Sequence, residues 1–179
     1  DHTVPVPWTP VKKSGGKYTT LNKAFTFGKG PFPATVKVDG EDVFKSGPAM
    51  MLNGSNITWS APVMKENTGD RVVFEGTGKK GTFTFRYRTE LWFDGMLKTD
   101  IFTDGKDAIK SLKLGWKVPA AQAQYLLNPL FTPWGGKDGE KLSLPYSNAQ
   151  DFMIWTMGFE KGVCFHPKSQ ANFVNRKNA

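Results

Sequence analysis

The sequence predicts an all-β fold, an antiparallel β-sandwich of about a dozen short strands with one short helix near 119–127. Residues 81–93 alternate with a period of two, which is typical of a strand with one buried face. One face carries Phe83, Phe85, Tyr87, Thr89, Leu91 and Phe93, and the other carries Thr82, Thr84, Arg86, Arg88, Glu90 and Trp92. Further short segments alternate along the chain, separated by turns rich in glycine, asparagine and aspartate. Because only one segment has good helical composition, the pattern favours a sandwich.

The chain of 179 residues is long enough for one full domain and too short for two of ordinary size. It contains no internal repeat and no break in composition. We therefore expect a single domain over 1–179, in which 1–11 form an extended lead-in and 166–179 a frayed tail. No apolar run approaches the roughly 18 residues of a transmembrane helix, and no signal segment is visible at the N-terminus.

The N-terminal third is expected to supply the lead-in and several short strands. Residues 4–11 contain three prolines, which exclude a helix and a central strand, and Trp8 is expected to pin this segment to the body. Alternation and turn signals then predict strands over residues 18–28, 34–38, 43–44, 49–52, 57–60 and 63–65.

A three-stranded antiparallel meander over 71–103 is expected to organise the fold. Its first two strands, 71–77 and 82–93, are joined by residues 78–81, which begin and end with glycine. A loop of two residues and a loop of four residues place the same side chains on the same face, so either keeps the aromatic side chains together. The predicted pairs are Phe74 with Phe85 and Val72 with Tyr87.

The second turn of the meander, around residues 94–95, allows two registers. A two-residue loop would place Lys98 and Asp100 on the aromatic face. A three-residue loop over 93–95 is favoured, because it pairs opposite charges outside and apolar residues inside, with Gly95 left-handed in a bulge. Its predicted pairs are Trp92 with Met96, Leu91 with Leu97, Glu90 with Lys98, Arg88 with Asp100, and Tyr87 with Ile101.

Beyond the meander, one helix and several strands are expected. Residues 119–127 begin with proline and continue with alanine and glutamine, which predicts the helix. The strands are expected over 109–118, 142–144, 152–157 and 163–165, the last two as a closing hairpin, and 131–140 form a loop.

Few residues suggest catalytic or metal chemistry. His2 and His166 are the two histidines and lie near opposite ends, which argues against a histidine-rich metal site and a catalytic triad. Cys164 is the single cysteine, so a disulfide framework and a cysteine-rich zinc site are excluded. Although Cys164 precedes His166 by two residues, a buried strand cysteine is favoured over a nucleophile. We predict no catalytic residue, no metal site and no cofactor.

The acidic residues do not indicate a glycosidase pair, which needs two carboxyl groups facing one cleft. Cross-strand partners account for Glu90 and Asp100. Turn geometry accounts for the aspartates that precede glycine, namely Asp39, Asp94, Asp104 and Asp138.

The net charge of +8 and the pI of about 9.5 raise nucleic acid or an anionic surface as a partner. Lysines occur singly or as doublets, such as Lys12-Lys13 and Lys79-Lys80, with no run of about five. Solvated turn lysines are therefore favoured, and neither nucleic acid nor a membrane is expected as a partner.

Exposed aromatic residues are the remaining signal. Trp92 falls on the polar face of the meander opposite Met96, and Trp134 lies in a glycine-rich loop. Either tryptophan could stack on a sugar ring, although contact with another part of the same protein is favoured. Trp92, Met96 and Trp134 are thus the candidate residues for carbohydrate binding or domain docking.

Four stretches carry a resemblance to a known family. They are 6–11 (Val-Pro-Trp-Thr-Pro-Val); 70–95, from Asp-Arg-Val-Val-Phe-Glu-Gly to Phe-Asp-Gly; 109–118; and 152–165, with Phe-Met-Ile-Trp, Gly158 and Glu-Lys-Gly-Val-Cys-Phe. Together they resemble the N-terminal β-sandwich domain of glycoside hydrolase family 123 and its uncharacterised bacterial relatives. The similarity covers nearly the whole chain in order, and none of the stretches is a catalytic signature.

The resemblance implies a β-sandwich that precedes a (β/α)8 barrel in a secreted or extracytoplasmic protein. In that family, an adjacent Asp-Glu pair of the barrel uses the substrate's 2-acetamido group as nucleophile on β-linked N-acetylgalactosamine. This chain contains no Asp-Glu dipeptide and stops where the barrel would begin, so no catalytic residue is carried over. It also has His-Pro-Lys-Ser at 166–169, where the family suggests an aromatic-acidic run.

Two hypotheses follow. The first is a non-catalytic accessory domain of a glycoside-hydrolase-like protein, which predicts an apolar outer patch around Trp92 and Met96 that the barrel would cover. The alternative is a stand-alone carbohydrate-binding module that uses exposed tryptophans to bind a glycan.

Overall fold

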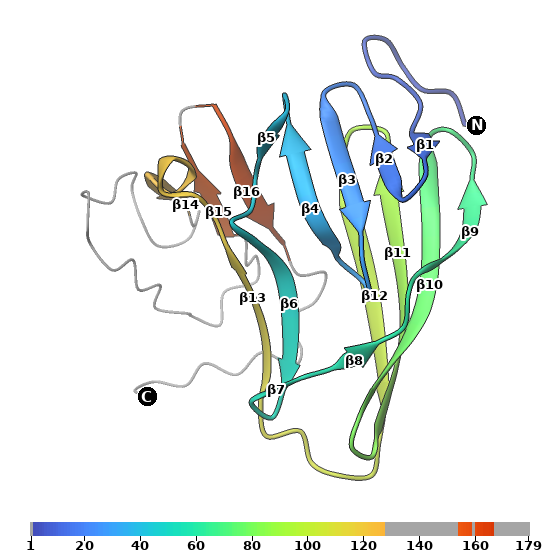
Figure 1. Ribbon diagram of the computed structural model, residues 1–179, viewed down its shortest axis with the longest axis vertical. Coiled ribbons are helices and arrows are strands. Elements are labelled where there is room, and N and C mark those ends of the chain that lie inside the picture. The colour runs from blue at the N-terminus through green and yellow to red at the C-terminus, as the bar shows by residue number, and fades with distance from the viewer. Residues whose placement is uncertain (1, 128–153, 159, 167–179) are drawn as a thin grey trace. The chain divides into compact units, whose positions relative to one another are not determined.

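The computed structural model describes residues 2–127, 154–158 and 160–166 (Figure 1). The chain divides into two compact units, 1–117 and 118–179, and each is described by itself. The single domain over 1–179 stays a prediction. The predicted loop and strand between 131 and 144, and the tail beyond His166, lie outside the described residues.

The predicted all-β class is confirmed, because strands make up 57% of the structure and helix only 2%. The first sheet has the order β1-β2-β3-β4-β5 and contains Lys12–Ser14, Lys17–Thr19, Lys23–Phe27, Pro33–Val38 and Glu41–Asp42. The second sheet, called the meander sheet below, has the order β12-β11-β10-β8, with β9 also paired to β10. Its strands are β8 Thr58–Trp59, β9 Val63–Asn67, β10 Arg71–Lys80, β11 Phe83–Trp92 and β12 Leu97–Asp104.

A third sheet of the first unit has the order β13-β6-β7, with β6 Ser46–Leu52, β7 Ser55–Asn56 and β13 Leu112–Lys117. The second unit contains a 3₁₀ turn, η1 Ala120–Gln122, and a sheet of order β14-β15-β16. The strands of that sheet are Tyr125–Leu127, Ile154–Met157 and Gly162–Phe165. Every strand pair of the described residues is antiparallel.

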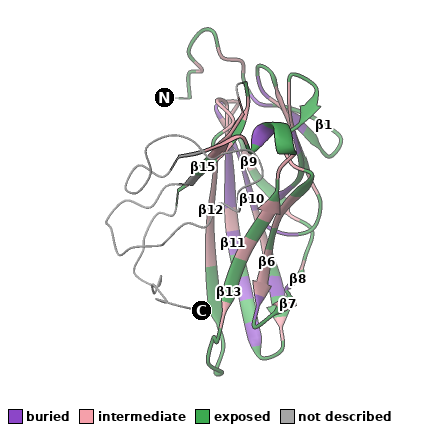
Figure 2. Cartoon of the chain, turned by 90° about the vertical axis from the view of Figure 1, so that its left-hand side faces the viewer, coloured by how far each residue is buried: buried purple, intermediate pink, exposed green. Residues whose placement is uncertain are grey.

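The core of the first unit lies between the first sheet and the meander sheet, which face each other in Figure 1. Tyr18 of β2 and Phe27 of β3 pack on Phe74 of β10, with ring centroids 5.0 and 4.6 Å away. Buried residues run along β10 and β11 (Figure 2), where the inward side chains alternate with outward ones. The third sheet extends the core, since its Leu52 clusters with Phe83 and Phe85. This is a sandwich-like arrangement.

The register of the second meander turn is confirmed. Glu90 lies opposite Lys98, Arg88 opposite Asp100, and Leu91 opposite Leu97. The Trp92 N–H donates to the Met96 carbonyl at 2.9 Å, which closes the three-residue loop. Gly95 has a φ of +85°, the left-handed conformation that a bulge of this kind requires.

The predicted register of the first meander turn is wrong, although the predicted side chains do share one face. Phe74 pairs with Thr89 rather than Phe85, because β10 continues through Lys80 and the turn is Gly81-Thr82. The predicted pairing of Val72 with Tyr87 fails with it, and Val72 lies opposite Leu91. The register differs because a glycine that is predicted to lie in the turn lies within β10.

Gly78, which is predicted to lie in the turn, is inside the strand, as is Gly76 of the predicted strand 71–77. The Tyr87 ring lies over Gly76 and the Trp59 ring over Gly78, where a Cβ atom would collide with either ring. The absent side chains therefore make room for aromatic rings within the sheet, a packing role that glycine also has in strands.

The predicted helix over 119–127 is wrong. Only Ala120–Gln122 turn, as a 3₁₀ segment without a side-chain cap, and β14 then pairs with β15. Pro119 cannot cap an N-terminus with a side-chain oxygen, and so short a helix is marginal without packing. Backbone pairing with Trp155–Met157 prevails over the modest helix propensity.

The N-terminal predictions are confirmed in part. Residues 2–11 form neither helix nor strand, and Trp8 makes an edge-on contact with Phe93 at 6.0 Å. The strand predicted over 18–28 is interrupted, since the Thr20 N–H donates to the Lys23 carbonyl in a turn between β2 and β3. The strand predicted at 43–44 lies at Glu41–Asp42 instead.

Candidate functional site

The candidate site is the outer face of the meander sheet, called the meander face below. The registers of β9 to β12 place Glu66, Val73, Glu90 and Lys98 in one row across four strands. Val73 is fully buried and Glu90 only 7% exposed, although both lie on the side away from the core. Other side chains of the meander face therefore surround this row.

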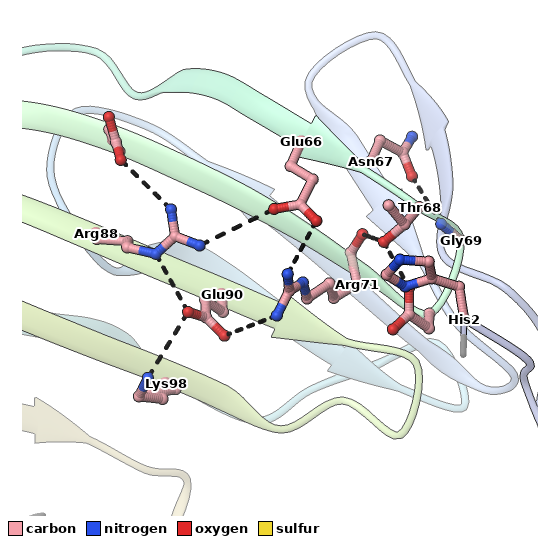
Figure 3. Close-up of polar contacts among 11 residues, drawn as sticks. His2, Glu66, Asn67, Thr68, Gly69, Arg71, Arg88, Glu90 and Lys98 are labelled. Atoms are coloured by element: carbon pink, nitrogen blue, oxygen red, sulfur yellow. Dashed lines mark hydrogen bonds and ion pairs between the residues drawn. The ribbon is translucent and has the colours of Figure 1, made fainter.

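Glu90 is bound by three cations (Figure 3). Its Oε1 accepts from Arg88 Nε at 3.2 Å and lies 3.7 Å from Lys98 Nζ, while its Oε2 lies 3.9 Å from Arg71 Nη1. A carboxylate this deeply buried is stable only when such partners replace its water.

The two arginines also share Glu66. Arg71 Nη2 donates to Glu66 Oε1 at 2.9 Å, and Arg88 Nη2 lies 4.0 Å from Glu66 Oε2. Arg88 reaches Glu75 as well, at 3.4 Å. The bond with Glu66 raises the pKa of Arg71, which keeps its guanidinium charged. Two arginines thus link three carboxylates across β9, β10 and β11, and we call these residues with Lys98 the ion-pair network.

A second polar cluster lies at the end of the meander face. Asp70 Oδ1 accepts from the Thr68 hydroxyl at 2.5 Å and lies 3.1 Å from His2 Nδ1. Burial alone would raise the pKa of Asp70, but the hydrogen bonds from Thr68 and His2 and the charge of His2 lower it. This carboxyl is therefore held ionised, the opposite of what a general acid requires.

The sequence-predicted site residues Trp92 and Met96 lie together at the second meander turn. Met96 is 53% exposed, while Trp92 is half-buried with the Arg71 guanidinium 5.4 Å from the centre of its ring. One face of the indole is thus already covered. Stacking of a sugar on Trp92 stays a prediction. Trp134 lies outside the described residues.

The exposed apolar residues of the meander face, Val63 of β9, Met96 and Phe102, are separated. Met96 immediately precedes β12, and Phe102 lies within β12. The Arg86 guanidinium carbon lies 5.9 Å from the centre of the Phe102 ring. Lys98 and Asp100, an ion pair at 3.3 Å, lie on the same face between Met96 and Phe102. Met96 therefore offers a small apolar contact bordered by charge.

Sequence reasoning missed a second feature, a hollow of about 440 Å³ on the outer face of the first sheet. Four lysines line it: Lys12, Lys17, Lys23 and Lys37. These residues lie on four successive strands, and the sequence favours reading them as separate solvated turn lysines. The signal available was the outward position of Lys12, Lys17 and Lys37 on the face that also carries Thr19 and Ala24.

Cys164 lies in the predicted closing strand, but the prediction that it is buried is wrong. It is exposed on β16, an edge strand of its sheet. Local desolvation nevertheless raises the pKa of the Cys164 thiol, which favours the protonated form and disfavours a nucleophile.

Comparisons with protein-family models, with curated proteins and with solved structures find no match to this chain. Within the described residues, no group of three or more histidine, cysteine or acidic side chains could hold a metal ion. No helix in the described part of the chain is long and apolar enough to cross a membrane.

Proposed function

We propose that this chain is a non-catalytic accessory β-sandwich domain of a glycoside-hydrolase-like protein. The family 123 resemblance of the sequence motivates the proposal. The observation that carries it is the ion-pair network, in which Glu66, Glu75 and Glu90 are held by Arg71 and Arg88. These three carboxylates therefore join neighbouring strands.

A glycosidase needs two carboxyl groups in different states, one protonated as general acid and one ionised. An apolar pocket around the acid normally provides that difference. Here Glu66 and Glu90 share Arg71 and Arg88, so both carboxylates have similar cationic surroundings. Such an arrangement supports a structural role over acid–base chemistry.

The docking partner in this proposal is a (β/α)8 catalytic barrel of the same protein. The contact would use Met96, which is exposed, and the neighbouring Trp92, whose ring is partly accessible. Interfaces between domains of one chain are commonly more polar than obligate ones, so charged borders around Met96 suit this contact.

The first test is turnover of an aryl N-acetyl-β-galactosaminide by the chain alone. We expect no release of the aryl group above the buffer rate. The matched variants are Glu66→Gln and Glu90→Gln, which remove charge from the network. Turnover by the chain that either variant abolishes would overturn the proposal.

The second test is the reading frame downstream of residue 179. We expect a segment of roughly barrel length, about 250 residues, that contains an Asp-Glu dipeptide. In that longer protein, Met96→Lys should weaken contact between the domains, measured as faster proteolysis between them. A downstream frame without such a segment contradicts the accessory role.

A further inference from the structure

The hollow on the outer face of the first sheet is a basic site that the accessory role leaves unexplained. Its volume of about 440 Å³ falls within the range of small-molecule sites. Strands β1 to β4 form its floor, and residues from the lead-in and from the turns after β2 and β4 close its end, namely Thr9, Asn22 and Gly40.

The register of the first sheet builds the hollow. Lys12 lies opposite Thr19, Thr19 opposite Ala24, and Ala24 opposite Lys37. Residues directly opposite each other share a face, so this row carries a lysine at each end and two short side chains between them. Lys17 lies diagonally from Lys12, at a backbone separation of about 7–8 Å.

The charge of the hollow is uncompensated at one end. Lys23 donates to the Asp94 carbonyl at 2.9 Å, and Lys37 pairs with Asp42 at 3.3 Å on the rim. By contrast, Lys12 and Lys17 have no carboxylate partner among the described residues, and the described lining contains no acidic side chain. Two lysines held close without a counter-ion attract an anion.

The remaining lining suits a hydroxylated ligand. Thr9, Thr19 and Asn22 contribute hydroxyl and amide groups. Thr20 also borders the hollow, but it is only 7% exposed and its Oγ1 is buried, so its hydroxyl is not accessible to a ligand there.

We infer that this hollow binds an anionic saccharide, through a carboxylate or sulfate group at Lys12 and Lys17 and sugar hydroxyls at the threonines. Nucleic acid fits less well, because the described lining offers no aromatic side chain for base stacking and no arginine for bidentate phosphate contacts. A duplex or a vesicle would also need a longer basic track than one hollow. The inference goes beyond the proposed accessory role and does not rest on it.

Calorimetric titration tests the inference. The probes are a uronate tetrasaccharide, a sulfated chondroitin tetrasaccharide and a neutral chitotetraose, each at low and physiological salt. We expect the acidic probes to bind, more weakly at higher salt, and the neutral probe not to bind. Lys12→Gln/Lys17→Gln should weaken binding at least tenfold. Lys37→Gln should weaken binding by a smaller factor.

The matched control is Lys79→Gln/Lys113→Gln, which removes the same charge from exposed lysines of the other two sheets and should change affinity less than twofold. Circular dichroism on every variant separates lost binding from lost folding. The inference is overturned by absence of acidic-probe binding, by equal losses in both double variants, or by loss with Trp92→Ala. Tighter binding of an oligonucleotide or an anionic vesicle at the same lysines overturns it as well. None of these results affects the turnover test of the accessory role.

Discussion

The two outer faces of the first unit are built on the same strand alternation and differ in how they treat charge. On the meander face, cations and carboxylates alternate across strands, and Arg71, Arg88, Glu66 and Glu90 satisfy one another. On the first sheet, Lys12 and Lys17 lie diagonally from each other and have no carboxylate partner among the described residues. A face that pairs its own charges contributes to stability, whereas one that leaves them open is available to a ligand.

The inner faces of the two sheets should contribute equally to the free energy of unfolding, despite this contrast between the outer faces. Phe74→Ala removes a buried ring from the meander sheet, and Phe25→Ala removes one from the first sheet. Each should lower the free energy of unfolding by about 3–5 kcal/mol, because a cavity replaces a packed ring. Urea denaturation measures both. A cost of less than about 1 kcal/mol for either would show that its sheet does not share the core.

The outer faces should respond differently to loss of one charge. Glu90→Gln leaves Arg71 and Arg88 without their buried anion, and we expect a loss of about 1–3 kcal/mol. Lys17→Gln is the control on the first sheet and should change the free energy of unfolding by no more than about 0.5 kcal/mol. Similar costs for the two substitutions would contradict the contrast between the faces.

Acid should act on the meander face through Asp70. Because the pKa of Asp70 is lowered in the folded protein, its contribution to stability is complete above the unfolded pKa of about 3.9. That contribution is lost as the pH falls through the folded pKa. Asp70→Asn should therefore cost about 1 kcal/mol at neutral pH and progressively less below about pH 4, measured by urea denaturation at each pH. A cost that is unchanged down to about pH 2 would contradict this role for Asp70.

The smallest effect on stability is expected from the open lysines. Lys12→Gln/Lys17→Gln removes repulsion between like charges, so the free energy of unfolding should rise by up to about 0.5 kcal/mol at low salt. Added salt screens the same repulsion, and the gain should disappear at high ionic strength. A loss of stability that salt does not change would show that these lysines have partners.

Sequence reasoning succeeded where local chemistry and register agree. The three-residue turn before Met96 was predictable because Gly95 permits the left-handed conformation and only one register pairs Glu90 with Lys98. It failed at Gly78, because glycine commonly signals a turn in a sequence, while here its missing side chain makes room for the ring of Trp59.

The candidate site was predictable only where its residues lie on strands joined by a short turn. The pairing of Arg88 and Glu90 with charges on β12 follows from the meander register, but Glu66 joins the network through β9, whose bulge no local pattern indicates. The basic hollow was missed for a similar reason. Lys12, Lys17 and Lys37 are brought together by three strand pairings, and charge counted along the chain does not reveal them.

The contrast between the faces is tested most directly by amide chemical-shift mapping of the chain titrated with an acidic tetrasaccharide. The account predicts shifts at Lys12, Lys17, Thr19 and Ala24 around the hollow, with the amides of Arg88 and Glu90 unchanged. Shifts centred on Arg88 and Glu90, or no shifts in either sheet, would contradict it.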